Sequence, residues 1–229
     1  MKKKSGLLLL LIVIYTMSNA QKSNCYLKAG VNLANVSYNS NGNIDDANML
    51  TSFQAGLIFD FPISSFVSVQ PGFLFTGKGS KTQSGNASDP NYYRASSNPY
   101  YVELPLNLIL KTPQANGIQF FAGAGPYLAI GVAGKRKAEG KIFGVAFNSE
   151  NNIEFSNDDP TTSGEEGAGF GILRRFDYGL NGTLGLEGKA NFFSVNYGLG
   201  LAKLQSGTNN STDANNKHRV LSFTIGFKL

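Results

Sequence analysis

The chain has little of several residue types on which common protein functions depend. A single cysteine, Cys25, excludes an internal disulfide, and a single histidine, His218, excludes a histidine-rich metal site. Beyond residue 15 no apolar run approaches the roughly 20 residues that a membrane-spanning helix needs. No later segment has a helical period of useful length, and no long repeat indicates a propeller or solenoid. We expect one domain, which would enter a membrane only as strands.

The N-terminal residues predict a secretory signal peptide. Three lysines precede an apolar run over 7–15, and small residues at 18–20 provide a signal-peptidase site. We expect cleavage after Ala20, so that the signal peptide is 1–20 and the mature domain is 21–229. The leader holds three of the 20 basic residues and none of the 15 acidic ones, so 17 against 15 remain and the mature net charge is +2. No nucleic-acid partner is expected at that charge.

The mature chain divides into about eight segments in which apolar and polar residues alternate. These segments are 26–38, 52–61, 66–77, 99–111, 118–131, 174–187, 191–203 and 218–229. Short connections rich in turn formers lie at 62–65, 112–117 and 188–191, and long polar ones lie at 39–51, 78–98, 132–173 and 204–217. Alternating short and long connections are typical of outer-membrane barrels, which have short periplasmic turns and long extracellular loops.

The two faces of these segments differ in an unusual way. Over 177–187 one face carries Tyr178 and leucines, whereas the other carries Asp177, Glu187 and mostly small residues. In a soluble barrel the bulky face would crowd the interior while glycines faced water. We therefore expect the bulky face to meet lipid and the small polar face to line the lumen. Aromatic residues near the short turns predict an interfacial girdle, formed by Phe59, Phe61, Phe66, Phe120, Phe121, Phe192 and Phe193.

Charged residues on the lumen face are expected to form a structural polar network that holds the lumen shut. Its predicted members are Lys28, Glu103, Lys111, Asp177 and Glu187, with Arg175 or Arg219 as further cations. The alternative is that Glu103, Asp177 and Glu187 are paired carboxylates for acid–base catalysis. A second catalytic alternative is a barrel hydrolase, with His218 as the base, Ser222 on the same face as the nucleophile, and Asp213 nearby in the loop as the acid. About 13 Å of strand separates His218 from Ser222, which is too far for direct activation.

Several phrases resemble the PorT-like outer-membrane β-barrel family, also described as an outer-membrane protein β-barrel domain. They are LKAGVNLANV (27–36), VSVQPGFLFTGKGSK (67–81), YVELPLNLILK (101–111), FAGAGPYLAIG (121–131) and FDYGLNGTLGLEG (176–188). The family's motif positions fall on Tyr101, Glu103, Pro105, Gly125, Pro126, Asp177 and Gly179. The resemblance implies an eight-stranded outer-membrane barrel and, through the founding member, a possible link to secretion machinery.

Two further patterns have weak functional interpretations. GFLFTGKG (72–79) has the glycine and lysine spacing of a phosphate-binding loop, but Gly79 stands where Ser or Thr is needed and no helix follows. Within the long connection 132–173, a basic cluster precedes an acidic one. The basic cluster suits lipopolysaccharide phosphates and the acidic one suits Ca²⁺. Solvated loop charges are the simpler interpretation of both.

The sequence thus predicts an all-β, eight-stranded antiparallel up-and-down transmembrane β-barrel in the outer membrane of a Gram-negative-type cell. We expect a non-catalytic protein with no metal or other cofactor, which is structural or binds a partner through its extracellular loops. Expected partners are outer-membrane lipid, the barrel-assembly machinery, and an extracellular ligand or a secretion-system protein, and the default state is a monomer. Alternatives are an outer-membrane enzyme acting at the extracellular rim and a soluble periplasmic barrel of the lipocalin type.

Overall fold

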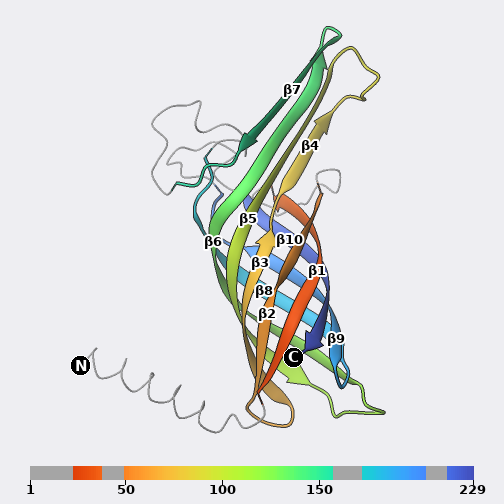
Figure 1. The fold of residues 1–229 in the computed structure, drawn as a ribbon, viewed down its shortest axis with the longest axis vertical. Helices are drawn as coiled ribbons and strands as arrows, with labels where there is room; N and C mark the ends of the chain where they lie inside the picture. Colours follow the sequence, from red (N-terminus) through yellow and green to blue (C-terminus); the bar gives the residue numbers. More distant parts are fainter. Residues whose placement is uncertain (1–22, 38–48, 157–171, 205–215) are drawn as a thin grey trace, which may run out of the picture.

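The computed structural model describes residues 23–37, 49–156, 172–204 and 216–229, so the predicted signal peptide lies outside the described residues. These residues form one antiparallel sheet (Figure 1). The first five strands are β1 (Asn24–Ser37), β2 (Leu50–Pro62), β3 (Val67–Gly77), β4 (Ser80–Ser84) and β5 (Tyr92–Lys111). The other five are β6 (Gln119–Ile142), β7 (Val145–Asn152), β8 (Phe176–Glu187), β9 (Asn191–Gly200) and β10 (Lys217–Lys228). No helix in this described part is long and apolar enough to cross a membrane.

Eight of the described strands close into a barrel. Neighbouring strands in the ring are β1, β2, β3, β5, β6, β8, β9 and β10, and β10 pairs with β1 from Tyr26↔Lys228 to Ser37↔Lys217. Ring closure gives every barrel strand a partner on both sides, which a strand in a hydrocarbon layer requires. The predicted eight-stranded up-and-down barrel is confirmed.

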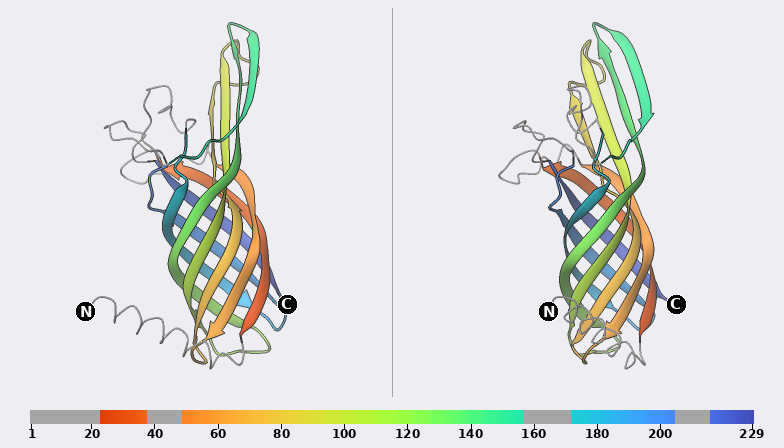
Figure 2. Two further views of the ribbon diagram at one scale, coloured as in Figure 1. Left: turned by 60° about the vertical axis from the view of Figure 1, so that its left-hand side comes forward. Right: turned by 90° about the vertical axis from the view of Figure 1, so that its left-hand side faces the viewer.

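The other two strands extend the wall beyond the barrel. β5 and β6 continue past the ring as far as the pair Tyr92↔Lys141, and β4 and β7 flank them to form a four-stranded sheet. Figure 2 shows this sheet, which we call the protruding sheet, rising from one side of the barrel. The segments 78–98 and 132–173 were expected to be loops, which is wrong for 80–84, 92–98, 132–142 and 145–152. Those strands face solvent on at least one side, so they lack the apolar alternation that identified the barrel strands.

The barrel turns its apolar residues outward, as the alternation predicts. Leu104, Leu106, Leu108 and Leu110 are each 50–58% exposed, whereas Tyr101, Glu103 and Ile109 on the other face of β5 are buried. This arrangement is the reverse of a lipocalin-type barrel, which needs a polar exterior. The predicted aromatic girdle is partly wrong. Phe59, Phe66, Phe120 and Phe193 are exposed, but Phe121 is buried against Phe192, which in turn packs on Tyr26 in the lumen.

A cluster of buried apolar side chains lies at the end of the barrel where the long connections are. This mouth cluster consists of Val36, Ile153, Leu173 and Leu204, with Phe155 packed against it. Phe155 and Leu173 form a parallel β-bridge, and the ring of Phe155 also packs edge-on against Tyr101 inside the barrel at 5.8 Å between centroids. The mouth cluster therefore covers the lumen at this end with side chains from four separate segments.

Candidate functional site

The part of the lumen nearest the mouth cluster, drawn uppermost in Figure 1, holds a buried cluster of three ionic side chains. Lys78 follows the last residue of β3, and its Nζ lies 2.7 Å from Glu103 Oε2 on β5 and 2.9 Å from Asp177 Oδ2 on β8. The three side chains are between 4% and 8% exposed. We call Lys78, Glu103 and Asp177 the upper cluster. One cation between two carboxylates therefore connects β5 and β8 to the residue that follows β3.

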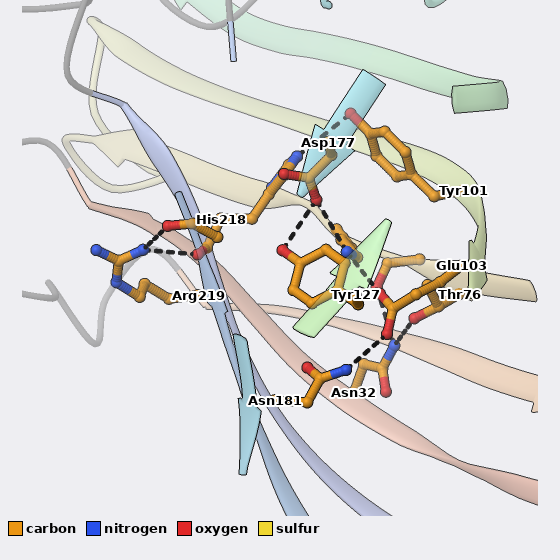
Figure 3. Close-up of polar contacts among 12 residues, drawn as sticks. Asn32, Thr76, Tyr101, Glu103, Tyr127, Asp177, Asn181, His218 and Arg219 are labelled. Carbon is orange, nitrogen blue, oxygen red and sulfur yellow. Dashed lines mark hydrogen bonds and ion pairs between the residues drawn. The ribbon is translucent and has the colours of Figure 1, made fainter. Parts of the chain in front are cut away.

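Polar and aromatic side chains surround the upper cluster (Figure 3). Tyr127 places its ring centroid 3.9 Å from Lys78 Nζ, and its hydroxyl donates to Asp177 Oδ2 at 3.1 Å. Asn181 donates to the second oxygen of Glu103 at 3.0 Å. A cation held by two carboxylates and an aromatic face retains its charge at a buried position because these groups replace water.

The single histidine lies beside this cluster in a tyrosine contact. His218 Nε2 is 3.3 Å from the hydroxyl of Tyr101, and the two rings meet edge-on at 5.4 Å between centroids. Ser222, the nucleophile of the enzyme alternative, lies four residues further along β10, which is two strand repeats. Among the described residues, no hydrogen bond joins it to His218. Asp213, the acid of that alternative, lies outside the described residues.

A second ion cluster closes the lumen at the short-turn end. Lys111 Nζ lies 2.7 Å from Asp60 Oδ2 and 2.8 Å from Glu187 Oε2. Gln70 donates to the other oxygen of Asp60, and Tyr26 donates to the other oxygen of Glu187 at 2.5 Å. We call Lys111, Asp60 and Glu187 the lower cluster. Every carboxylate oxygen in it accepts a hydrogen bond, which is the condition under which a buried ion pair is stable.

Two small spaces lie in the lumen between the clusters, lined by described residues. One cavity of about 40 Å³ and another of about 20 Å³ are both lined by Lys28, Asn107 and Asn196. Spaces of this size hold about one to a few water molecules. A larger recess of about 410 Å³ lies at the short-turn end and is lined by the lower cluster. Between the two clusters, side chains therefore occupy most of the described lumen, as is usual for eight strands.

All five predicted network residues lie in the barrel interior. Lys111 pairs with Glu187, as expected, whereas the partners of the other three differ from those expected. Glu103 and Asp177 share Lys78, Lys111 and Glu187 belong to the lower cluster, and Lys28 donates to Asn196 at 3.2 Å. Arg219, expected as a lumen cation, donates to the carbonyls of Gly200 and His218. The other expected cation, Arg175, donates to the carbonyl of Phe155. The cation between Glu103 and Asp177 is therefore Lys78, which was not among the expected cations.

Sequence reasoning missed Lys78 and Asp60 as members of the two clusters. Lys78 follows the last residue of the β3 alternation, and its neighbours Gly77 and Gly79 drew attention to a phosphate-loop spacing. Asp60 lies on the predicted lumen face, so its place in the alternation could have identified it as a lumen anion. No three His, Cys, Asp or Glu side chains in the described ranges are grouped to hold a metal ion.

The motif positions of the resemblance meet in one part of the barrel. Tyr101, Glu103 and Asp177 surround Lys78, and Pro105 pairs with Tyr127 across the β5–β6 ladder. Gly179 pairs with Tyr127 from β8, where a Cβ would lie 2.7 Å from the tyrosine ring. The two remaining motif positions, Gly125 and Pro126, lie on β6 immediately before Tyr127. These positions therefore shape the packing around the upper cluster.

Removal of Glu103 tests the upper cluster. In Glu103→Ala, Lys78 keeps Asp177 as its counter-ion, so the loss corresponds to hydrogen bonds with charged groups, about 1.5–3 kcal/mol. We expect a lower unfolding temperature for the purified barrel, read as the temperature at which its gel mobility changes. An unchanged unfolding temperature would show that the ion pair contributes nothing to the fold.

The protruding sheet has two distinct faces. The face that continues the outer wall of the barrel carries Lys81, Arg94, Lys135, Lys137, Glu139, Lys141 and Glu150. Five cations and two anions give this face a net charge of +3. The opposite face carries Tyr93 and Phe147, whose rings stack at 6.4 Å on either side of Gly140. The basic cluster thought to be a loop thus lies on strand β6.

Ion pairs on the charged face are exposed. Lys135 and Lys137 lie 2.7 and 3.0 Å from Glu150, and their hydrogen bonds hold the pKa of its carboxyl below the ordinary value. The hydrogen bond that Lys135 donates to Glu150 in turn raises the pKa of the Lys135 ammonium group. Because the carboxyl pKa is lower in the folded state, the pairs stabilise the sheet above the ordinary pKa of glutamate and lose their effect as the pH falls through the lowered value. Solvent keeps this effect small.

A model of the family described as outer membrane protein beta-barrel domain matches residues 19–206. The chain belongs to this family. It is thus a small outer-membrane β-barrel protein, and its exposed apolar wall lies against lipid. The match does not extend to the PorT-like subdivision, which stays an expectation from the sequence phrases. No curated protein sequence matches the chain.

Solved structures of other outer-membrane proteins resemble the chain at low sequence identity. The attachment invasion locus protein Ail of Yersinia pestis is 12% identical, with a TM-score of 0.40, over 91% of this chain and 100% of the Ail chain. Neisserial surface protein A is also 12% identical, with a TM-score of 0.42 and the same coverage.

Proposed function

We propose that the protein is a non-catalytic outer-membrane barrel that holds the protruding sheet outside the cell, where the sheet binds a partner or ligand. The contrast between lumen and sheet supports this proposal. In the lumen the charged side chains of the upper and lower clusters bind one another, and the mouth cluster covers the lumen at the other end from the short turns. The protruding sheet instead ends in two edge strands, β4 and β7, and every residue of β7 is exposed. Edge strands and exposed faces are the parts of a sheet that are available for binding.

The orientation follows from the connection lengths. Short turns join β2 to β3, β5 to β6 and β8 to β9 at one end, and the protruding sheet is at the other end. In outer-membrane barrels the short turns face the periplasm. The protruding sheet therefore lies outside the cell, and export requires cleavage of the signal peptide after Ala20 and insertion by the barrel-assembly machinery as a monomer.

Labelling of intact cells tests this orientation. In a Cys25→Ser background, Asn148→Cys in β7 is expected to react with a membrane-impermeant maleimide on intact cells. Ser65→Cys in the β2–β3 turn is expected to react only after the outer membrane is permeabilised. The opposite pattern would place the sheet in the periplasm and exclude the proposed function.

The filled lumen predicts that the protein is not a diffusion pore. Planar bilayers containing the purified protein are expected to show no stable conductance steps above background, because both ion clusters and the mouth cluster fill the path. Stable steps would show that solutes pass, and would replace the binding role by a transport role. A part in secretion machinery stays the expectation that the PorT-like resemblance gives.

A further inference from the structure

The far tip of the protruding sheet is apolar and exposed. β6 and β7 are joined by a two-residue turn of Phe143 and Gly144, flanked by the pair Ile142↔Val145. Phe143 is 87% exposed, Val145 72% and Ile142 58%. Figure 1 shows this turn at the end of the molecule opposite the short-turn end of the barrel. These apolar side chains therefore do not meet the membrane in which the barrel sits.

Phe143, at the tip, has a backbone conformation that is unfavourable for a bulky side chain. Phe143 has a φ of 50° and Gly144 a φ of 81°, the positive values that a type I′ hairpin turn requires. Asn or Asp is the usual residue at the first of these positions, and a bulky residue there is uncommon. A large aromatic ring at this position is thus not explained by the turn itself, and points to a role for the side chain.

The tip is also held in place by the neighbouring connection 85–91. The backbone N–H of Phe143 donates to Asn91 Oδ1 at 3.0 Å, and that of Gly144 donates to the carbonyl of Pro90 at 2.9 Å. Lys141 Nζ donates to the carbonyl of Ala87 at 2.8 Å. An exposed turn with these fixed contacts presents its apolar side chains in one arrangement, which lowers the entropy cost of binding.

Cations follow the apolar tip along the sheet. Lys141 is adjacent to Ile142, Arg94 lies in the next row, and Lys81 with Lys137 lies behind it. Acidic residues on the same elements are Glu139, Glu150 and, in the connection 85–91, Asp89, and cations still predominate on the outer face. An apolar end backed by cations matches the layers of an anionic lipid bilayer, in which hydrocarbon lies below phosphate and carboxylate headgroups.

We propose that the β6–β7 tip inserts Phe143, Ile142 and Val145 into the interfacial layer of an anionic lipid bilayer that faces the cell, while the lysines of the sheet bind its headgroups. The protruding apolar point has no concave face of its own, and a deformable lipid layer can surround it without a matching pocket. This inference rests on the proposed function and names an anionic lipid surface as the partner of the sheet.

Vesicle binding tests the lipid preference. The mature chain, residues 21–229, is embedded in nanodiscs for this test. It is expected to float with vesicles of phosphatidylcholine and phosphatidylserine, and to bind vesicles of phosphatidylcholine alone much more weakly. Phe143→Asp is expected to weaken binding about tenfold or more, because burial of the ring is lost. Lys137→Glu combined with Lys141→Glu is expected to weaken binding to the anionic vesicles about tenfold or more.

A matched charge control and a spectroscopic probe complete this test. Lys189→Glu combined with Lys228→Glu makes the same charge change at the short-turn end and is expected to keep full binding. The chain has no tryptophan, so Phe143→Trp in nanodiscs with a tryptophan-free scaffold gives a single reporter. Its emission is expected to shift to the blue on anionic vesicles and to be quenched by brominated lipid, whereas Asn151→Trp on the shaft of β7 stays unchanged.

Three results would overturn the proposal: equal binding by wild type and Phe143→Asp, equal binding to both kinds of vesicle, or an unchanged emission of Phe143→Trp. Each variant is checked for folding by its gel mobility before and after boiling. The vesicle assay does not depend on the orientation of the barrel in cells. Failure here with correct surface labelling would leave the sheet outside the cell with a partner other than lipid, whereas failed labelling would reject the proposed function itself.

Discussion

Replacing Lys78 by alanine is expected to destabilise the folded barrel by about 3–5 kcal/mol, the cost of leaving buried charges without a counter-ion. Glu103 and Asp177 both lie within 3 Å of Lys78 Nζ and are almost fully buried, so their carboxylates would face each other across the vacated space. The effect should exceed that of Glu103→Ala, which leaves one ion pair intact. The unfolding temperature of the purified barrel measures this difference.

Two further variants separate charge from packing at this site. Lys135→Ala removes an exposed cation from the protruding sheet, where the Lys135 side chain is 63% exposed, and is expected to change the unfolding temperature little. Lys78→Met combined with Glu103→Gln and Asp177→Asn removes all three charges and should recover part of the lost stability. If Lys78→Ala unfolds at the wild-type temperature, the upper cluster does not stabilise the barrel.

Gly125→Ala is expected to prevent β5 and β6 from pairing normally, at a cost of about 3 kcal/mol or more. A Cβ at Gly125 would lie 1.9 Å from the backbone carbonyl oxygen of Leu106, and a backbone atom cannot move aside as the end of a side chain can. The ladder between the two strands already has a gap there, since Pro105↔Tyr127 is followed by Leu108↔Ala124. The expected readout is loss of the folded, heat-modifiable band.

The matched control is Gly182→Ala on β8. A Cβ at Gly182 meets no atom within 4 Å, so the same chemical change should leave the barrel folded. Equal tolerance of alanine at both positions would contradict the close approach of β5 and β6 at Gly125. Equal loss at both would indicate that glycine is needed for another reason, such as chain flexibility during insertion.

The barrel could be predicted because alternation is a local signal. Leu104, Leu106 and Leu108 define one face of β5 without any knowledge of the neighbouring strands, and Glu103 then falls on the other face. The protruding sheet gave no such signal. In β7 every residue is exposed, so its sequence needs no apolar face, and only the pairing with β6 identifies it as a strand.

The partners of the lumen charges could not be predicted in the same way. A strand pattern gives the face on which a residue lies, but the pairs depend on which strands are opposite across the barrel and at what height. Lys78 lies beyond the end of β3 and still reaches Asp177, a residue 99 positions away in the sequence. Likewise, Ile153, Leu173 and Leu204 lie in connections without apolar alternation, and only the fold brings them together over the lumen.

The most direct test of the inside-out barrel is fractionation of cells that express the tagged protein, followed by electrophoresis with and without boiling. The account predicts recovery in the outer membrane and a band whose mobility changes on boiling, because a closed barrel with an apolar exterior resists detergent until it is heated. Recovery as a soluble periplasmic protein, with one mobility before and after boiling, would contradict the outward orientation of the leucines and with it the roles assigned to the lumen and the protruding sheet.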